Sequence, residues 1–302
     1  MLTQAVDSYL ALRRAAGFAL RSEGTLLRSF AAFSAGRSES YVRAAVAIEW
    51  AGSAHSPFQR ARRLGIVIRC ARHLHAEDQS HEIPPQIFGS EKPPRPTPYI
   101  LSPEQIVNLV RTASQSGYRT LRRATYSTLF ALLACTGLRV SEAIQLRFED
   151  IVADGLLIRC SKFRKSRLVP LHETAREGLE RYVAQRRPYA PADDHLFISL
   201  RRKPLLPTDV DTAFRTAARA IGLPVSPERP RATPHSLRHS FAVRALRSCP
   251  DGRDGISKHM VALSTYLGHA KVSDTYWYLE AVPELLQDIA ERCERFVMGG
   301  RP

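Results

Sequence analysis

Apolar residues recur at helical spacing along most of this 302-residue chain, and the spacing divides it into segments. Two long helices are expected in the first 88 residues, the second running through 66–68 and punctuated by arginines. The apolar face of the first helix begins with Ala5, Tyr9, Leu10 and Leu12. Pro84 and Pro85 end the region, because proline cannot continue a helix. The pattern therefore predicts a helical N-terminal domain over residues 1–89.

Residues 90–98 read Ser-Glu-Lys-Pro-Pro-Arg-Pro-Thr-Pro, a Pro-rich and charged stretch. Proline fixes φ and lacks an N–H donor, so this stretch is expected to be an extended, semi-rigid linker. The alternative is a surface loop inside one domain. With the linker interpretation the chain has an N-terminal domain over 1–89, a linker over 90–98 and a second domain over 99–302.

Residues 99–302 alternate helical periods with short apolar runs. A helix is expected to start at Ser102, since Ser102, Pro103 and Gln105 form a capping box with proline at the first helical position. Further helices are expected over 126–135, 174–186, 207–221, 257–267 and 283–297, and others begin at 233 and 273. Two strands over 156–160 and 167–171 form a hairpin, and 196–198 is a possible third strand. The predicted fold class is therefore mainly α with a small β-sheet, a helical domain followed by an α+β domain.

Charge narrows the function classes. The chain has 44 Lys and Arg against 29 Asp and Glu, a formal net charge of +15, which implies a polyanionic partner such as nucleic acid or an anionic membrane surface. The longest apolar run, near 129–135, is far short of the ~20 residues of a membrane span. Asp7, Arg13 and Arg14 interrupt any signal-peptide core. The five cysteines are scattered without a Cys-x-x-Cys pair, so a cytoplasmic setting without a zinc site is expected.

The last third carries the candidate chemistry. His235 and Arg238 are three residues apart on one predicted helix, so both side chains project from the same face toward one phosphate. Arg139 follows the helix stop at Thr136-Gly137, where an arginine fork and helix N-terminal amides could meet a phosphate together. Histidines move or hold protons, and a tyrosine oxygen can form a covalent bond to phosphorus. Tyr278 lies nine residues after His269 (278 − 269 = 9) and completes the set.

The order and spacing of these residues resemble the tyrosine recombinases, the phage integrase family, from about residue 99 to the C-terminus. The family pattern of Arg, Lys, His-x-x-Arg, His and Tyr is filled by Arg139, Lys162, His235, Arg238, His269 and Tyr278. The stretch 275–284 further resembles a subgroup carried by transposons and plasmids. The resemblance implies a helical core-binding domain, a catalytic domain and an integrase or transposase activity.

The resemblance also implies a role for each residue. Tyr278 would attack the scissile phosphate and form a 3′-phosphotyrosyl link, while Arg139 and Arg238 clamp the non-bridging oxygens. Lys162 would protonate the departing 5′ oxygen, and His269 would hydrogen-bond a non-bridging oxygen. Glu142 either orients Arg139 through a salt bridge or is a first-turn carboxylate favoured by the helix dipole. The implied partners are double-stranded DNA, a synaptic tetramer of this chain and accessory proteins, with no cofactor, metal or membrane.

Several alternatives stay open at this stage. Tyr276 competes as the nucleophile and Lys165 as the general acid. His235 and His239 are four apart, but no carboxylate lies between them and Arg238 would repel a metal ion. A type IB topoisomerase-like enzyme and a non-enzymatic DNA-binding protein are the rival functions.

Arg164, Lys165 and Arg167 in the hairpin are interpreted as ordinary phosphate contacts. The residues expected to bind DNA are Arg62, Arg63, Arg164, Lys165, Arg201 and Arg202.

Overall fold

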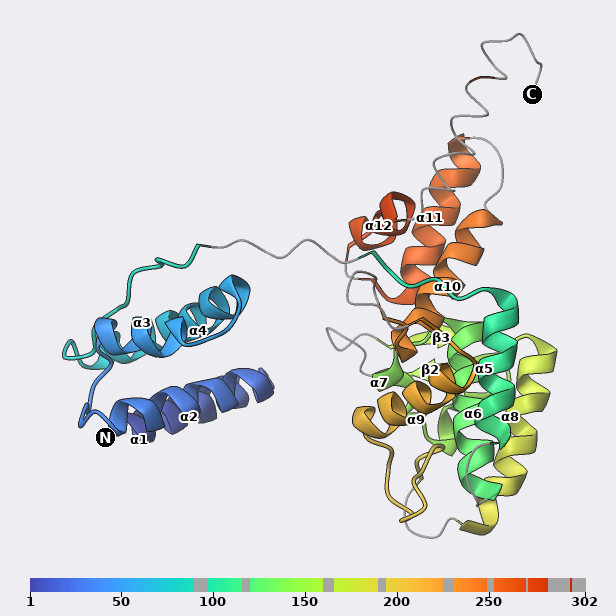
Figure 1. Ribbon diagram of the computed structural model, residues 1–302, viewed down its shortest axis with the longest axis horizontal. Coiled ribbons are helices and arrows are strands. Elements are labelled where there is room, and N and C mark those ends of the chain that lie inside the picture. The colour runs from blue at the N-terminus through green and yellow to red at the C-terminus, as the bar shows by residue number, and fades with distance from the viewer. Residues whose placement is uncertain are drawn as a thin grey trace. The chain divides into compact units, whose positions relative to one another are not determined.

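The computed structural model divides the chain into two compact units, Met1–Arg95 and Pro96–Pro302 (Figure 1). It describes residues 1–89, 97–115, 120–159, 166–189, 194–224, 231–248, 253–269, 271–281 and 294. Most of the predicted linker over 90–98 lies outside the described residues. Each unit is built around its own apolar core.

The first unit consists of four helices (Figure 1). They are α1 (Leu2–Ala15), α2 (Arg21–Ala35), α3 (Ala44–Gly52) and α4 (Pro57–Glu77). The start of α4 follows from its sequence, because Ser56 Oγ accepts a hydrogen bond from Gln59 N at 3.2 Å and proline occupies the first helical position. Tyr9 and Leu10 are buried as the pattern predicts, but the expectation for Leu12 is wrong, since Leu12 is exposed.

Helix α6 (Thr120–Thr136) runs through the core of the second unit and packs against several other helices. Leu129, Phe130 and Leu133 on α6 are fully buried. The helices around α6 are α5 (Pro103–Gln115), α8 (Glu173–Arg186) and α10 (Pro234–Arg247), and α9 (Pro207–Ala220) packs on α5. The capping box at the start of α5 is confirmed: Ser102 N donates to Gln105 Oε1 at 3.0 Å, and Gln105 N donates to Ser102 Oγ at 3.2 Å.

A three-stranded antiparallel sheet lies beside these helices, in the order β1-β2-β3. The strands are β1 (Ile151–Val152), β2 (Gly155–Ile158) and β3 (Arg167–Val169), with Leu156 opposite Val169 and Ile158 opposite Arg167. The predicted hairpin is therefore confirmed, although β1 was not expected. The strand expected over 196–198 is wrong: the segment is buried but makes only isolated bridges, Arg147 with His195 and Ile198 with Pro204.

Two further helices close the second unit over α10. They are α11 (Arg253–Leu267) and α12 (Ser273–Ala281), and a separate apolar cluster joins them to α10 through residues such as Val243, Met260 and Leu263. The terminal helix expected over 283–297 lies outside the described residues, apart from Glu294. In the part of the chain that the structure describes, no helix is both long and apolar enough to cross a membrane.

Candidate active site

Arg238 is buried at the centre of the second unit, 2% exposed. Its Nη1 donates to the carbonyl oxygen of Gly137 at 2.6 Å, and its Nη2 donates to that of Leu267 at 2.7 Å. The guanidinium thus joins the end of α6 to the end of α11, two segments far apart in the sequence. Burial, and then the charge of Arg139, lowers the pKa of Arg238 to about 10, so the side chain stays charged at neutral pH.

Arg139 lies beside it, in the turn that joins α6 to the short helix α7 (Val140–Ala143). Its Nη2 donates to the carbonyl oxygen of Gly268 at 2.7 Å. Because Leu267 and Gly268 are consecutive, their carbonyl groups hold the two arginine side chains next to each other, and His269 follows at once. The arrangement gathers positive charge at one place, as a phosphate site requires.

Glu142 connects Arg139 to the sheet. Its carboxylate accepts from Arg139 Nη1 at 2.7 Å and from the Arg139 backbone N–H at 3.0 Å. The same carboxylate accepts two hydrogen bonds from Arg167, at 3.0 and 2.8 Å. Both interpretations of Glu142 from the sequence therefore apply, since it pairs with Arg139 and also caps the first turn of α7.

The interpretation of Arg167 as an ordinary phosphate contact is wrong. Its side chain is only 12% exposed and its Nε also donates to the carbonyl oxygen of Tyr266 at 2.9 Å. A bidentate pair with a buried carboxylate satisfies this guanidinium inside the protein. No local pattern indicates this pair, because Arg167 and Glu142 are 25 residues apart.

Two glycines allow the arginines to approach the helix ends. Gly137 and Gly268 both have positive φ, +62° and +65°. A Cβ on Gly137 would lie 2.5 Å from the ring of Phe241, and a Cβ on Gly268 would lie 2.8 Å from Arg167 Nη1. Glycine is therefore required at both positions, for conformation and for space.

Tyr278 is buried against α10, 2% exposed, whereas Tyr276 is 50% exposed. Residues two apart on a helix face different ways, which explains the contrast. The hydroxyl of Tyr278 lies 3.1 Å from His239 Nδ1, and the rings of His239 and Trp277 are in edge contact at 5.4 Å between centroids. Tyr278 is also close enough to Arg238 to influence its pKa. Of the two candidate tyrosines, Tyr278 is therefore the one buried near Arg238.

Two histidines contact this tyrosine, and a third contacts one of them. The ring of His239 contacts that of His235 at 4.5 Å, and the ring of His269 is stacked 6.3 Å from that of Tyr278. His269 Nδ1 is also 2.8 Å from Thr275 Oγ1, which ties the loop after α11 to α12. Burial and nearby positive charges lower the pKa of His239 to about 3, and partial desolvation and the charges of Arg238 and Arg139 lower that of His235, although His235 stays exposed.

The site thus contains a residue that the sequence did not identify. His239 was considered only as one of a metal pair, yet it contacts the tyrosine hydroxyl. The available signal was its spacing of four from His235, which places both on one face of α10. Among the described residues, no group of three His, Cys, Asp or Glu side chains could hold a metal ion.

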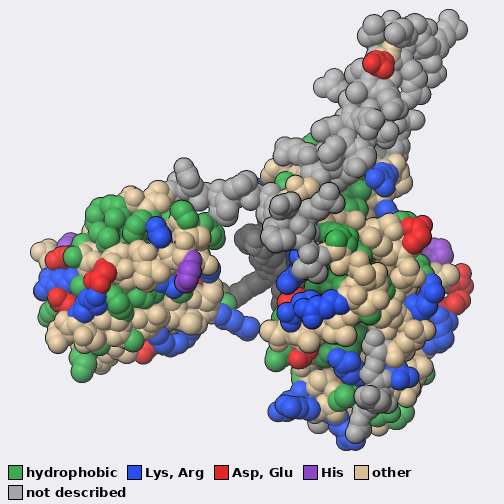
Figure 2. Space-filling model, in the orientation of Figure 1, with side chains coloured by type: hydrophobic (Ala, Val, Ile, Leu, Met, Phe, Trp, Pro, Cys, Tyr) green, Lys and Arg blue, Asp and Glu red, His purple; other side chains and the backbone are tan. Residues whose placement is uncertain are grey.

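The other predicted residues fall into two groups, those outside the described residues and those described on other parts of the two units. Lys162, Arg164 and Lys165 lie outside the described residues. Arg201 and Arg202 are exposed on a tight turn in which Arg202 N donates to Ser199 O at 2.9 Å. In the first unit, Arg62 is exposed and Arg63 lies over the ring of Trp50. Lys and Arg side chains are visible on the drawn face of both units (Figure 2).

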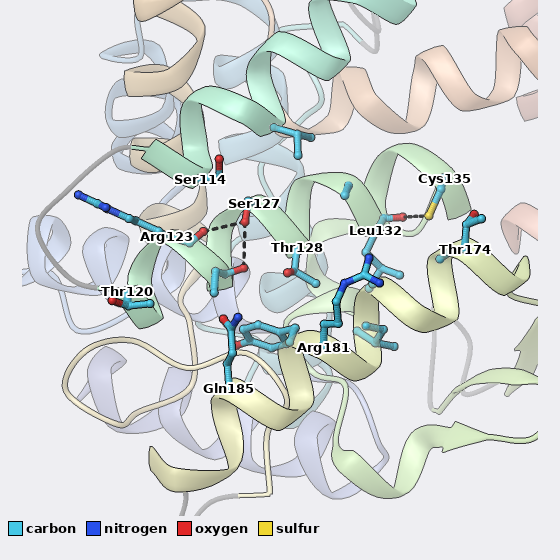
Figure 3. Close-up of a pocket in the computed structure, with 17 residues that line it drawn as sticks. Ser114, Thr120, Arg123, Ser127, Thr128, Leu132, Cys135, Thr174, Arg181 and Gln185 are labelled. Carbon is cyan, nitrogen blue, oxygen red and sulfur yellow. Dashed lines mark hydrogen bonds between the residues drawn. The ribbon is translucent and has the colours of Figure 1, made fainter.

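The second unit has one cavity beside the cluster and another away from it. One of about 770 Å³ opens beside Arg139 and Glu142, and Arg147 and Arg159 also line it. Another, of about 640 Å³, lies among α5, α6 and α8, with Ser127, Cys135 and Arg181 around it (Figure 3). None of the candidate catalytic residues that the structure describes lines that second hollow. Of these two cavities, the one beside Arg139 adjoins the cluster, through Arg139 and Glu142.

The fold and the cluster indicate a class of protein: a mostly helical unit whose arginines, histidines and tyrosine hydroxyl are groups suited to bind and attack a phosphate ester. Comparison with known proteins supports this class. The sequence profile of the phage integrase family matches residues 100–284. Integrase/recombinase y4rB of Sinorhizobium fredii is 36% identical, over 97% of this chain and 96% of that protein. Tyrosine recombinase XerD of Caulobacter vibrioides is 30% identical, over 78% of this chain and 75% of its own length.

The chain therefore belongs to the phage integrase family, the tyrosine recombinases, which are enzymes that break and rejoin DNA strands. The resemblance seen in the sequence is confirmed.

Solved structures support the fold. The XerH site-specific recombinase in a post-cleavage complex with a palindromic difH substrate has a TM-score of 0.67 at 18% identity, covering 91% of this chain and 80% of that one. The Tn1549 transposon integrase in complex with transposon right end DNA has a TM-score of 0.61 at 17% identity, covering 96% and 98%. The predicted fold class, mainly helical with a small sheet, is confirmed.

Proposed function

We propose that this protein is a site-specific DNA recombinase or integrase that breaks and rejoins DNA strands through a 3′-phosphotyrosyl intermediate. One observation carries the proposal. The carbonyl oxygens of consecutive residues 267 and 268 accept hydrogen bonds from Arg238 and Arg139, and His269 and Tyr278 lie beside them. This cluster offers positive charge for a phosphate and a hydroxyl for attack. The DNA in the XerH and Tn1549 structures supports duplex DNA as the partner.

The roles follow from the chemistry of the groups. Tyr278 Oη forms a bond to phosphorus as the bond to the 5′ oxygen breaks, and Arg139 and Arg238 stabilise the charge that develops on the non-bridging oxygens. His235 and His269 hydrogen-bond the same phosphate.

Lys162, on the hairpin between β2 and β3, supplies the proton to the 5′ oxygen. Glu142 and Arg167 position Arg139. A 5′-hydroxyl from the partner strand then attacks the phosphotyrosine and rejoins the DNA.

Because the covalent intermediate conserves the energy of the broken bond, the reaction needs neither a nucleotide nor a metal ion. Exchange between two DNA sites requires several protomers, so we propose a tetramer of this chain on DNA, with DNA-bending accessory proteins. The two units grip the duplex together, with Arg62 and Arg63 on one and Arg164, Lys165, Arg201 and Arg202 on the other. We place the protein in the cytoplasm, as expected for an enzyme that acts on the DNA of its cell.

Strand exchange on the DNA that flanks the gene tests the proposal. Two supercoiled plasmids carrying these flanks are incubated with the protein, and recombinant junctions are sequenced. Junctions at one defined position are the expected result. Relaxation of the plasmids without new junctions would instead assign a topoisomerase activity, and binding without any cleavage would assign a DNA-binding protein.

A further inference from the structure

His239 lies where it can act on the nucleophile itself. Its Nδ1 is 3.1 Å from the hydroxyl oxygen of Tyr278, a hydrogen-bond distance between side chains 39 residues apart. The two rings meet at an angle of 61°, with centroids 5.5 Å apart. The contact joins α10, which carries Arg238, to α12, which carries the tyrosine.

The surroundings fix the direction of this hydrogen bond. The charged groups that face His239 are positive or become positive on protonation: Arg238 and His235 on α10, and His269 after α11. Together with burial, they keep the imidazole neutral. A neutral imidazole has one acceptor nitrogen. The phenol oxygen has Arg238 nearby, so its lone pairs are attracted toward the guanidinium and its proton is directed away, toward His239.

We propose that His239 accepts a hydrogen bond from the Tyr278 hydroxyl and so orients the lone pairs of the nucleophilic oxygen toward the phosphate held by the arginines. The proposal rests on the proposed function. Had Nδ1 donated instead, it would occupy a lone pair that the attack needs. An acceptor on the O–H bond also increases the electron density of the oxygen. As the Oη–P bond forms, the Oη–H bond breaks and its proton passes to Nδ1 of His239, which is a group that touches the reacting atom.

The test compares variants of the full chain by single-turnover formation of the covalent DNA adduct, with DNA affinity measured separately. His239→Phe keeps an aromatic ring in contact with Trp277 but has no acceptor, so the rate of adduct formation should fall on the order of tenfold, the value of one hydrogen bond, while affinity is unchanged. His239→Asn retains an acceptor near the position of Nδ1 and should recover most of the rate. A wild-type rate for His239→Phe, or an equal loss in both variants, would overturn the proposal.

A second substrate separates the nucleophile from the leaving group. With sulfur in place of the 5′ oxygen, the leaving thiolate needs no proton. The defect of His239→Phe should persist on this substrate, whereas a defect of Lys162→Ala should be relieved. Relief of His239→Phe as well would place His239 on the leaving-group side and contradict the assignment.

The direction of the bond can be measured without DNA and without relying on a variant that folds poorly. Nitrogen-15 NMR of the histidine side chains should show His239 neutral at pH 6 with its proton on Nε2, and Tyr278→Phe should shift the Nδ1 signal. A protonated Nδ1 would overturn the proposal. If wild-type protein formed no adduct, the proposed function would fail, and this measurement would still decide the hydrogen bond.

Discussion

The carboxylate of Glu142 is the element of the site whose contribution can be worked out most fully. Burial alone would raise its pKa, but hydrogen bonds from Arg167 and from the Arg139 backbone outweigh burial and lower the pKa from 4.5 to about 2. The change is Glu142→Gln, which keeps the shape of the side chain and removes its charge. Both guanidinium groups then lose their common anion, and removal of one partner of a buried pair costs about 3–5 kcal/mol.

The pH dependence of the unfolding free energy isolates the contribution of the Glu142 charge. Since the pKa is lower in the folded protein, the carboxylate stabilises the fold above pH 4.5, and this contribution is lost as the pH falls toward 2. The full shift corresponds to about 3 kcal/mol. The difference in unfolding free energy between wild type and Glu142→Gln should therefore be largest at pH 7. It should shrink by about 0.4 kcal/mol at pH 4.5 and by about 1.4 kcal/mol at pH 3.5.

Urea unfolding of the second unit provides the assay. Trp50 and Trp277 are the two tryptophans of the chain, so a Trp50→Phe background leaves the fluorescence of Trp277 to report on this unit. Glu177→Gln is the control, because Glu177 is exposed and its contact with Arg181 is 3.7 Å long. The control should change stability little at any pH. A difference between wild type and Glu142→Gln that stays constant from pH 7 to 3.5 would refute the reasoning.

Three further outcomes are expected. Gly268→Ala should slow adduct formation about tenfold or more without weakening DNA binding, because its Cβ would lie 2.8 Å from Arg167 Nη1, whereas the control Gly222→Ala, also at positive φ, meets nothing within 4 Å and should keep the rate. Equal rates for the two would exclude the steric argument. Strand cleavage should continue in EDTA, and a strict requirement for Mg²⁺ at that step would contradict the mechanism. Arg62→Ala should reduce the slope of log affinity against log salt by about 0.9, and an unchanged slope would remove Arg62 from the DNA contacts.

The sequence predicts best what is decided locally. The capping box at Ser102 marks the start of α5, and glycines at 137 and 268 mark the ends of α6 and α11, because caps and positive φ are properties of a few neighbouring residues. The possible strand over 196–198 is not formed, since the apolar run reflects burial and the segment makes an isolated bridge instead of a ladder.

What depends on distant contacts could not be predicted. In the sequence Arg167 resembles any surface arginine, and its pairing with Glu142, 25 residues away, is visible only in the structure. The role proposed for His239 depends on its contact with Tyr278, 39 residues later in the sequence. Neither contact follows from spacing along the chain, because each is made by packing: of α12 on α10 for His239, and of the sheet on α7 for Arg167.

The central claim is that Tyr278 becomes covalently attached to DNA. The most direct measurement is to incubate the protein with DNA from the flanks of its gene, stop the reaction with SDS, isolate protein that remains on DNA, and identify the nucleotide-bearing peptide by mass spectrometry. The account predicts an adduct on Tyr278 in the wild type and in Tyr276→Phe, and none in Tyr278→Phe, which should still bind DNA. An adduct that persists in Tyr278→Phe, or that maps to Tyr276, would contradict it.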